Sequence, residues 1–298
     1  MTASEKRTLE RVQAPVLKKR SQLFEIWDRL KTNRLAMVGM AIVLVLIFCA
    51  VFADWVAPYD INAQDLSARL VYPCLAHPLG TDNYGRDILS RIIYGGRISL
   101  LVSLMAVLSS VVVGGLIGAI SGYFGGKVDA VIMRLMDVLM AIPGTLLAIC
   151  VSSMLGNGIW QTAIAVAVGG IAPSCRMLRA TALGIREEEY IEAARASGSR
   201  NLRIILSHVI PNCLAPIIVD STLRLGGNIM MISGLSFIGL GVQPPTPEWG
   251  SMLNAGREFI RQFYPLITFP GLAIMLTMFG FNMFGDGLRD AMDPKLKE

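Results

Sequence analysis

Long apolar segments alternate with short polar ones along most of the chain. No charged residue occurs over residues 35–53, 98–126, 138–175 or 262–285. Roughly 20 apolar residues are needed to cross the hydrocarbon core of a bilayer, whereas apolar runs of 10 to 14 residues are more typical of a buried core helix. We therefore interpret these segments as membrane-spanning helices and not as the core of a soluble protein. The pattern predicts six spans, at about residues 35–57, 98–122, 130–155, 158–175, 210–232 and 265–287.

The predicted fold class is an all-α polytopic membrane protein with six transmembrane helices. Composition agrees, since 53% of the 298 residues are hydrophobic and only 16% are charged, against about a quarter charged in soluble domains. The fifth span is the least clearly bounded. A semi-apolar stretch at residues 232–242 follows it and is a candidate re-entrant segment.

Residues 1–34 are polar and precede the first span. Six Lys and Arg residues within residues 1–20 predict a basic tail. Leu23, Ile26, Trp27 and Leu30 then recur at helical spacing, which predicts an amphipathic helix on the membrane surface; a solvated lead-in to the first span is the alternative. The expected regions are this tail and helix (1–34), the first span with an extracytoplasmic loop (35–97), a core transmembrane domain (98–288) and a C-terminal tail (289–298).

Lys and Arg are distributed unevenly between the two sides of these spans. If the N-terminus is inside, nineteen basic residues lie on the inner side and six lie in the outer loops. Basic residues concentrate on the cytoplasmic side of membrane proteins. Both termini and the polar segment between the fourth and fifth spans are therefore predicted to be cytoplasmic. The net charge of +5 then reflects membrane orientation, and we expect a lipid bilayer and no nucleic acid as partner.

Small residues mark one helix face in the second span. Gly114, Gly118 and Gly122 are spaced by four, and small residues at this spacing allow close approach of helix backbones in membranes. We expect a packing face here and no chemistry.

Two pairs of opposite charges fall within predicted spans. Arg134 and Asp137 are three residues apart, and Asp220 and Arg224 are four apart, so each pair can neutralise itself along one helix face. Ionisable residues inside a membrane are also candidates for function. The sequence leaves both interpretations open.

Motifs of catalysis and metal binding are missing from the sequence. It contains no G-x-S-x-G, H-E-x-x-H or Walker A motif, and its five cysteines include no C-x-x-C pair. His77 and His208 are far apart and have no neighbours that resemble metal ligands. We expect no enzymatic activity, metal or cofactor in this chain, so that any nucleotide would be bound by another chain.

The cytoplasmic segment between the fourth and fifth spans reads EEEYIEAARASGSRNLRIILSHVIPN. Tyr190, Ala193, Ala194 and Ser197 recur on one helical face, and Gly198 then predicts a turn or C-cap. A second helix follows and ends near Pro211, at the start of the fifth span. This helix–Gly–helix segment has a small-residue face suited to docking into another protein, although a solvated loop helix has the same pattern.

This segment resembles the EAA loop of ATP-binding-cassette importer permeases. Glu192, Ala193, Ala194, Gly198 and Pro211 occupy the places of the family motif, which reads E-A-A, three residues, G, nine residues, I-x-L-P. His208 and Ile210 stand where the motif has Ile and Leu, so its second half matches less closely. The resemblance implies that segment 186–211 couples to an ATPase, with Tyr190 on the same helix.

Three further stretches resemble the C-type subunit of the peptide/nickel branch of these permeases. They are LGTDNYGRDILSRIIYGGRISL (79–100), QPPTPEWGSML (243–253) and FNMFGDGLRDAMDPKLK (281–297). The resemblance implies a type I importer fold in a bacterial cytoplasmic membrane. It also implies a second, homologous permease, two ABC ATPase subunits that bind ATP and magnesium, and an extracytoplasmic solute-binding protein.

The function expected from this resemblance is ATP-driven import of a small solute. The branch imports dipeptides, oligopeptides, glutathione and nickel, and the sequence does not choose among them. A self-contained secondary transporter or channel is the alternative. Internal repeats would favour that alternative, and the sequence contains no convincing repeat.

Overall fold

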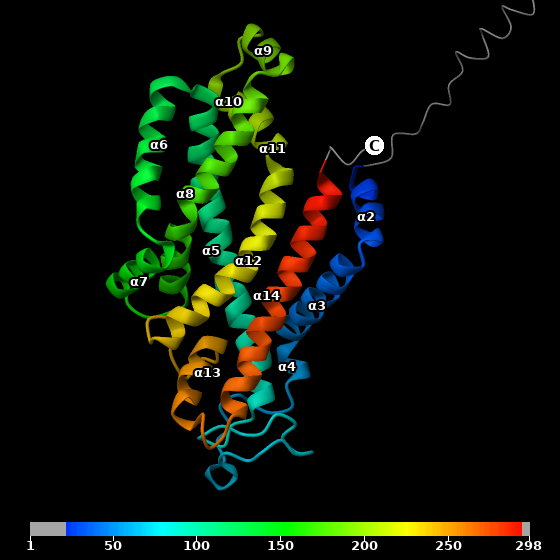
Figure 1. Cartoon of the computed structure of the whole chain (residues 1–298), viewed down its shortest axis with the longest axis vertical. Helices are drawn as coiled ribbons and strands as arrows, with labels where there is room; N and C mark the ends of the chain where they lie inside the picture. Colours follow the sequence, from blue (N-terminus) through cyan, green and yellow to red (C-terminus); the bar gives the residue numbers. More distant parts are fainter. Residues whose placement is uncertain (1–21, 294–298) are drawn as a thin grey trace, which may run out of the picture.

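The computed structural model describes residues 22–293, which form a bundle of helices elongated along one axis (Figure 1). The basic tail predicted over residues 1–20 and the last residues of the predicted C-terminal tail lie outside the described range. The helices in chain order are α2 Gln22–Thr32, α3 Arg34–Val51, α4 Ala53–Val56, η1 Leu66–Ala68, α5 Ile88–Phe124, α6 Gly126–Ala141, α7 Gly144–Leu155, α8 Ile159–Arg186, α9 Glu189–Ala196, α10 Asn201–Ile204, η2 Ile205–Val209, α11 Ile210–Asn212, α12 Leu214–Phe237, α13 Trp249–Gly256, η3 Arg257–Phe259 and α14 Pro265–Met292.

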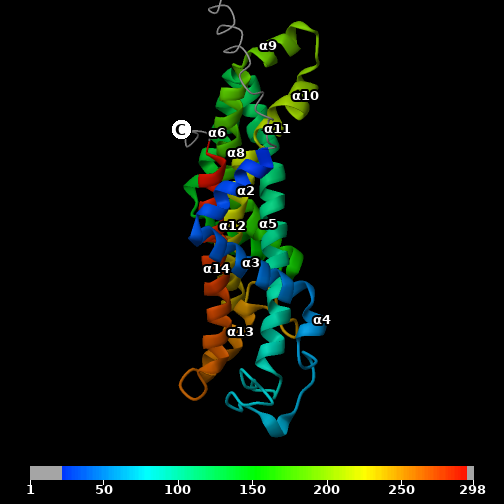
Figure 2. The same ribbon diagram turned by 90° about the vertical axis from the view of Figure 1, so that its right-hand side faces the viewer.

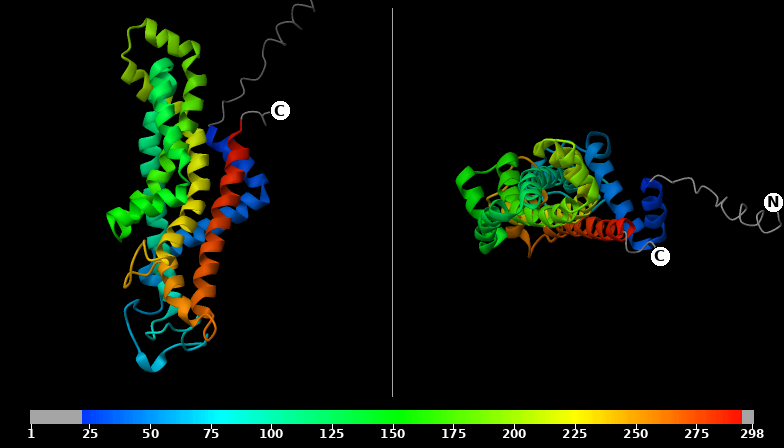
Figure 3. Two further views of the ribbon diagram at one scale, coloured as in Figure 1. Left: turned by 60° about the vertical axis from the view of Figure 1, so that its left-hand side comes forward. Right: turned by 90° about the horizontal axis from the view of Figure 1, so that it is seen from above.

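The two ends of the bundle differ. At one end, which we call the α9 end, lie α9, α10 and α11, together with the start of α2 and the end of α14 (Figures 1 and 2). At the other end, which we call the α13 end, lie α13 and the long connection between α4 and α5. Seen end-on, the first and last helices of the described chain lie side by side at one edge of the bundle (Figure 3).

Four helices are long and apolar enough to cross a membrane: α3, α5, α8 and α14. Two bent pairs, α6 with α7 and α10–α11 with α12, bring the number to six if each pair is one span. Large apolar side chains on these helices face outward, among them Phe48, Leu108, Val131, Ile164 and Phe279. An apolar outer surface of this extent suits lipid and not water, so the prediction of an all-α polytopic membrane protein is confirmed.

The third predicted span, residues 130–155, is not one continuous helix. The chain bends by 86° between α6 and α7, and the break falls at Ile142 and Pro143, which are both extended. Proline disfavours the helical conformation in the residue before it, which explains why α6 ends at Ala141. The span predicted over residues 130–155 thus corresponds to a bent pair of helices, and the prediction did not include the bend.

Two other span boundaries also differ from the prediction. α5 begins at Ile88, ten residues before the predicted start, because Asp87 caps it by accepting a hydrogen bond from the backbone nitrogen of Ser90. α12 continues to Phe237, so residues 232–237 of the candidate re-entrant stretch form its last turns, and residues 238–242 lie beyond it. Gly239, with φ +85°, ends that helix.

α5 and α8 make the most extensive helix–helix contact in the described chain. A Cβ added at Gly114 or Gly118 would lie 2.3 Å from the carbonyl oxygen of Ile171 or Cys175, respectively. A Cβ at Gly122 would lie 2.7 Å from Cβ of Ala182. The three glycines thus face α8 at backbone distance, which is the geometry that small residues allow in membrane helices.

At the α13 end, Glu248 is a fully buried carboxyl group that caps α13. It accepts hydrogen bonds from the backbone nitrogens of Gly250 (3.0 Å) and Ser251 (2.8 Å) and from Ser99 Oγ on α5 (3.2 Å). Burial raises the pKa of this carboxyl group, and the two backbone hydrogen bonds oppose that rise. The next residue, Trp249, donates its Nε1 proton to the Ile92 carbonyl over 2.9 Å. Glu248 and Trp249 together fasten α13 to α5.

We expect Gly118→Ala to destabilise the bundle, because the added methyl group would meet a backbone carbonyl that cannot move without separating α5 from α8. Overpacking of this kind costs about 1–3 kcal/mol. Gly184→Ala on α8 is the matched control, since no atom lies within 4 Å of its Cβ position. Thermal unfolding of the detergent-solubilised protein should show a lower midpoint for Gly118→Ala and an unchanged or higher one for Gly184→Ala. Equal midpoints would contradict the packing argument.

Candidate functional site

The α9 segment, residues 187–212, stands at one end of the bundle and is held by its apolar side. Ile191 is fully buried and packs in a cluster with Leu178, Ile204 and Val209. Ala194 is half-buried against the same cluster. α9 is thus held by contacts on its buried face, and its opposite face is exposed.

The open face of α9 carries Tyr190, Glu192 and Ala193, which are all exposed, and Ser197 is exposed after it. The small-residue face predicted from the sequence is therefore divided, because Ala194 turns partly toward its own chain. Burial raises the pKa of the Tyr190 phenol, and the charge of Glu188 adds to this rise. An exposed face with a small residue at its centre is suited to close contact with another protein.

Gly198 ends α9 with φ +80°. The Gly198 nitrogen donates to the Arg195 carbonyl over 2.9 Å, and the Ser199 nitrogen donates to the Ala194 carbonyl over 3.1 Å. These bonds satisfy carbonyl groups that the end of a helix leaves free. No atom lies within 4 Å of the Cβ position, so the backbone angle requires glycine here and the available space does not.

The second half of the α9 segment contains one turn of π-helix. α10 passes into η2, Ile205–Val209, where the Ile210 nitrogen donates to the Ile205 carbonyl five residues back. Pro211 follows in the short α11 and is exposed. Proline lacks an N–H group and its ring clashes with the carbonyl four residues earlier. The wider turn accommodates that ring, and the chain then bends by 60° into α12.

Tyr123, at the end of α5, connects the α9 segment to the bundle. Its hydroxyl group donates to Asn201 Oδ1 over 2.9 Å and accepts from Arg195 Nε over 3.3 Å. The Arg195 guanidinium lies 4.8 Å from the centre of the Tyr123 ring, a cation–π distance. Sequence reasoning missed this residue, because a tyrosine at the end of an apolar span is also typical of a membrane interface.

The charge pair predicted between Arg134 and Asp137 needs a correction. Asp137 on α6 forms its ion pair with Arg176 on α8. Within the described residues, no ion pair or hydrogen bond of the Arg134 side chain is seen. α6 packs beside α8, so a partner across the helix interface outcompetes the neighbour on the same helix.

Asp220 and Arg224 on α12 do pair, with Arg224 Nε 2.7 Å from Asp220 Oδ2. The geometry does not make this contact a hydrogen bond, because the buried Oδ2 atom has no hydrogen-bond partner. Arg224 Nη1 also donates to the Gly170 carbonyl (3.0 Å) and to Ser174 Oγ (3.1 Å) on α8. Arg224 therefore joins α12 to α8 near Pro173, where proline interrupts the backbone ladder of α8.

A further ion pair between α6 and α8 was not predicted. Asp129 receives two hydrogen bonds from the Arg179 guanidinium, one of them at 2.6 Å, and one from Ser121 Oγ at 2.6 Å. A bidentate contact of this kind is stronger and more directional than a single bond. The sequence offered a weak signal, namely one acidic and one basic residue near the ends of successive spans.

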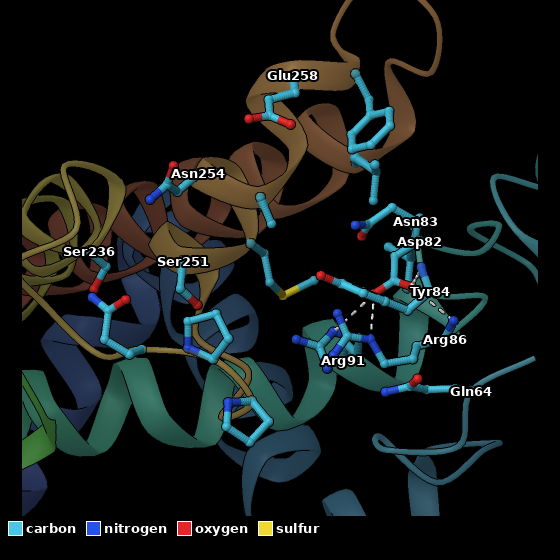
Figure 4. Close-up of a pocket in the computed structure, with 18 residues that line it drawn as sticks. Gln64, Asp82, Asn83, Tyr84, Arg86, Arg91, Ser236, Ser251, Asn254 and Glu258 are labelled. Carbon is cyan, nitrogen blue, oxygen red and sulfur yellow. Dashed lines mark hydrogen bonds and ion pairs between the residues drawn. The ribbon is translucent and has the colours of Figure 1, made fainter. Parts of the chain in front are cut away.

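At the α13 end, a polar pocket of about 540 Å³ opens between α5, α13 and the preceding loops (Figure 4). Asp82, Arg86 and Arg91 lie together in it. Glu258 and Asn254 line another part of its wall. Among residues 22–293, no group of three or more His, Cys, Asp or Glu side chains is placed to hold a metal ion.

Two family profiles match this chain. The family described as binding-protein-dependent transport system inner membrane component matches residues 114–298. The family described as the N-terminal TM domain of oligopeptide transport permease C matches residues 21–78. The first match includes the whole α9 segment.

Similar proteins are known from several bacteria. The di/tripeptide transport system permease protein DppC of Pseudomonas aeruginosa is 42% identical over 283 residues, which cover 93% of each chain. The dipeptide transport system permease protein DppC of Alkalihalophilus pseudofirmus is 44% identical, over 92% of this chain and 90% of its own. The glutathione transport system permease protein GsiD of Escherichia coli O6:K15:H31 is also 44% identical, over 93% and 92%.

Among solved structures, an inward-facing conformation of the MetNI methionine ABC transporter has a similar fold. The TM-score is 0.54 at 16% sequence identity, over 67% of this chain and 96% of the other. This similarity concerns the fold alone. The profile matches and the similar transport permeases assign the chain to transport and not to catalysis, and to an ATP-driven importer and not to a self-contained carrier or channel. The chain belongs to the family of binding-protein-dependent transport system inner membrane components, as a permease subunit of an ATP-binding-cassette importer.

Proposed function

We propose that this chain forms, together with a second homologous permease, the path by which a small peptide or related solute enters the cell. The observation that carries this proposal is the 42–44% identity to permeases named for dipeptides, di/tripeptides and glutathione, over more than nine-tenths of the chain. A binding screen on the cognate solute-binding protein, with dipeptides, oligopeptides, glutathione and nickel chelates, tests the solute class. Binding of none of the peptide compounds would contradict it.

The partners in this proposal are two ATPase subunits, which bind ATP and magnesium, and an extracytoplasmic solute-binding protein. The α9 segment is the element that transmits ATPase movement to the spans. Its exposed face, with Tyr190, Glu192 and Ala193, docks in a groove of one ATPase, while Ile191 and Tyr123 hold it to the bundle. The division of α9 into one buried and one open face supports this role.

The α9 end is proposed to be cytoplasmic, in a bacterial inner membrane. The start of α2, the end of α14 and the α9 segment all lie at this end (Figure 1). The excess of Lys and Arg also falls there. The α13 end then faces outward, where the solute-binding protein docks.

We expect Ala193→Trp to uncouple the complex, because a large ring on the exposed face would keep the ATPase from docking. Ala193 is a cleaner test than Ala194, since Ala194 is half-buried against its own chain. The purified complex should contain less ATPase, and solute-stimulated ATP hydrolysis should fall roughly tenfold or more, the effect of losing about 1.4 kcal/mol or more of docking free energy. Ala41→Trp, at an exposed position on the apolar helix α3, is the control. Normal ATPase content and hydrolysis in Ala193→Trp would overturn the docking role.

Gly198 gives a second test, which separates backbone angle from size. Gly198→Asn and Gly198→Val both fit the open space, but asparagine tolerates the left-handed conformation and a β-branched residue does not. We expect hydrolysis stimulated by solute to be nearly normal in Gly198→Asn and strongly reduced in Gly198→Val, with both proteins inserted in the membrane. Equal loss in the two variants would show that the backbone angle is not what matters.

The proposed orientation can be tested with cysteine chemistry. Cys74 is exposed in the connection before α5, so a membrane-impermeant maleimide added to intact cells should label it. In a Cys74→Ser background, Ala196→Cys at the exposed end of α9 should react only after the membrane is opened. Labelling of Ala196→Cys in intact cells would reverse the orientation.

A further inference from the structure

The pocket at the α13 end contains two guanidinium groups that share one carboxylate. Arg86 Nε donates to Asp82 Oδ2 over 2.7 Å, and Arg91 Nε lies 3.8 Å from the same oxygen (Figure 4). The other oxygen of Asp82 accepts hydrogen bonds from the backbone nitrogens of Tyr84 and Arg86. Asp82 thus forms its hydrogen bonds with the turn and with Arg86, and its ion pair with Arg91 is long.

The second carboxylate of this turn does not balance the remaining charge. Asp87 accepts hydrogen bonds from the Ser90 backbone and hydroxyl group, and its other oxygen lies 3.0 Å from His77 Nδ1. Arg91 Nη1 donates to the Ile61 carbonyl over 3.3 Å, which is a neutral partner. The two guanidinium groups on this wall of the pocket therefore face only one carboxylate.

These guanidinium groups are nearly buried but not enclosed. The side chains of Arg86 and Arg91 are 9% and 6% exposed. Among the described residues, fully buried side-chain nitrogen or oxygen atoms without a hydrogen bond occur only in Asp220 and Ser233. Guanidinium nitrogens of Arg86 and Arg91 that lack a protein partner therefore keep some accessible surface, and both side chains line the pocket. A buried cation that faces a cavity is a site for an anionic group.

Another wall of the pocket carries a negative charge. Glu258, on η3, is exposed, and no ion pair or hydrogen bond of its side chain is seen among residues 22–293. In Figure 4 it lies across the pocket from Arg91. Neutral amide side chains of Gln64, Asn83 and Asn254 also line the pocket. A pocket with cations on one wall and an anion on another is complementary to a zwitterion.

We propose that this pocket binds a small zwitterionic solute, with its carboxylate on Arg86 and Arg91 and its ammonium group toward Glu258. The volume of about 540 Å³ falls in the usual range for small-molecule sites, roughly 300–1,000 Å³. A two-residue peptide, at most about 7 Å long, has charges of this kind at its two ends. The inference rests on the proposed uptake of peptide-like solutes. It adds a binding site for them in this subunit, at the outer end of the proposed path.

The test uses the complex of both permeases and both ATPases in lipid nanodiscs, without the solute-binding protein. Saturation-transfer NMR measures the binding of alanyl-alanine, of its C-terminal amide and of its N-acetyl form. Alanyl-alanine should bind most tightly, because only this compound carries both charges. Loss of either charge should weaken binding about tenfold, the effect of losing one charge-assisted contact.

Variants of the pocket residues test which side chain contacts the carboxylate of the dipeptide and which contacts its ammonium group. Arg91→Gln should weaken binding of alanyl-alanine but leave that of the amide unchanged, and Arg91→Lys should retain part of the affinity. Because Arg91 also holds the turn, Glu258→Gln gives an independent test at an exposed side chain. It should weaken binding of alanyl-alanine and of the amide, but not that of the N-acetyl form. Arg261→Gln, which is exposed and does not line the pocket, is the matched control.

Equal binding of the three compounds by the unmodified complex, or no binding, would overturn the proposal. It would also fail if Arg91→Gln weakened docking of the empty solute-binding protein and left dipeptide binding unchanged, since the pocket would then serve a protein contact. Uptake of alanyl-alanine by the complete transporter is measured separately. If alanyl-alanine is taken up normally but does not bind at this pocket, only the proposed binding site is refuted. If it binds at the pocket but is not taken up, the proposed function is refuted.

Discussion

The contact between α5 and α8 is the constraint on which the rest of the structure depends. Gly114 and Gly118 bring the two helix backbones so close that a single methyl group would meet a carbonyl oxygen. No apolar driving force draws helices together in lipid, so backbone proximity of this kind supplies the packing. The 37 residues of α5 extend about 55 Å, and this seam holds the helix in one position along α8.

Because α5 is one rigid helix, it connects the two ends of the molecule. Its first turn carries Arg91 in the pocket at the α13 end, and its last turn carries Tyr123 against the α9 segment. Coupling between distant sites needs a physical element that both sites contact, and α5 is such an element. Movement of the α9 segment would reach α5 directly through Tyr123 and Ile191. On the way to α12, the same movement would have to pass the π-turn and the 60° bend before it.

The order of helices and the position of the α9 segment could be predicted from the sequence, because both follow from local patterns. Apolar length revealed the spans, and the spacing of Gly114, Gly118 and Gly122 marked the face that meets α8. The bend at Pro143 was missed because a hydropathy pattern gives the length of an apolar segment and not the direction of its helix axis. The partner of Asp137 was missed because Arg176 is distant in sequence, and helix spacing favours the neighbour three residues away. Arg91 looked like an outer-loop charge because the start of α5 was placed too late.

The charges inside the bundle also help to fasten particular helices to one another. α8 is joined to α5 by the glycine seam, to α6 by the Asp129–Arg179 and Asp137–Arg176 pairs, and to α12 by Arg224. Further extensive contacts join α14 to α3 and α12, and α12 to α5. α12 also packs on α8 directly, since Ile232 and Leu235 share an apolar cluster with Ala163 and Val166, and Arg224 adds hydrogen bonds to Gly170 and Ser174. Polar contacts between membrane helices contribute about 0.6 kcal/mol on average, so the apolar cluster, and not Arg224 alone, fastens α12 to this group. The α5–α8 seam cannot open without parting two backbones, which makes these two helices the fixed part of the subunit.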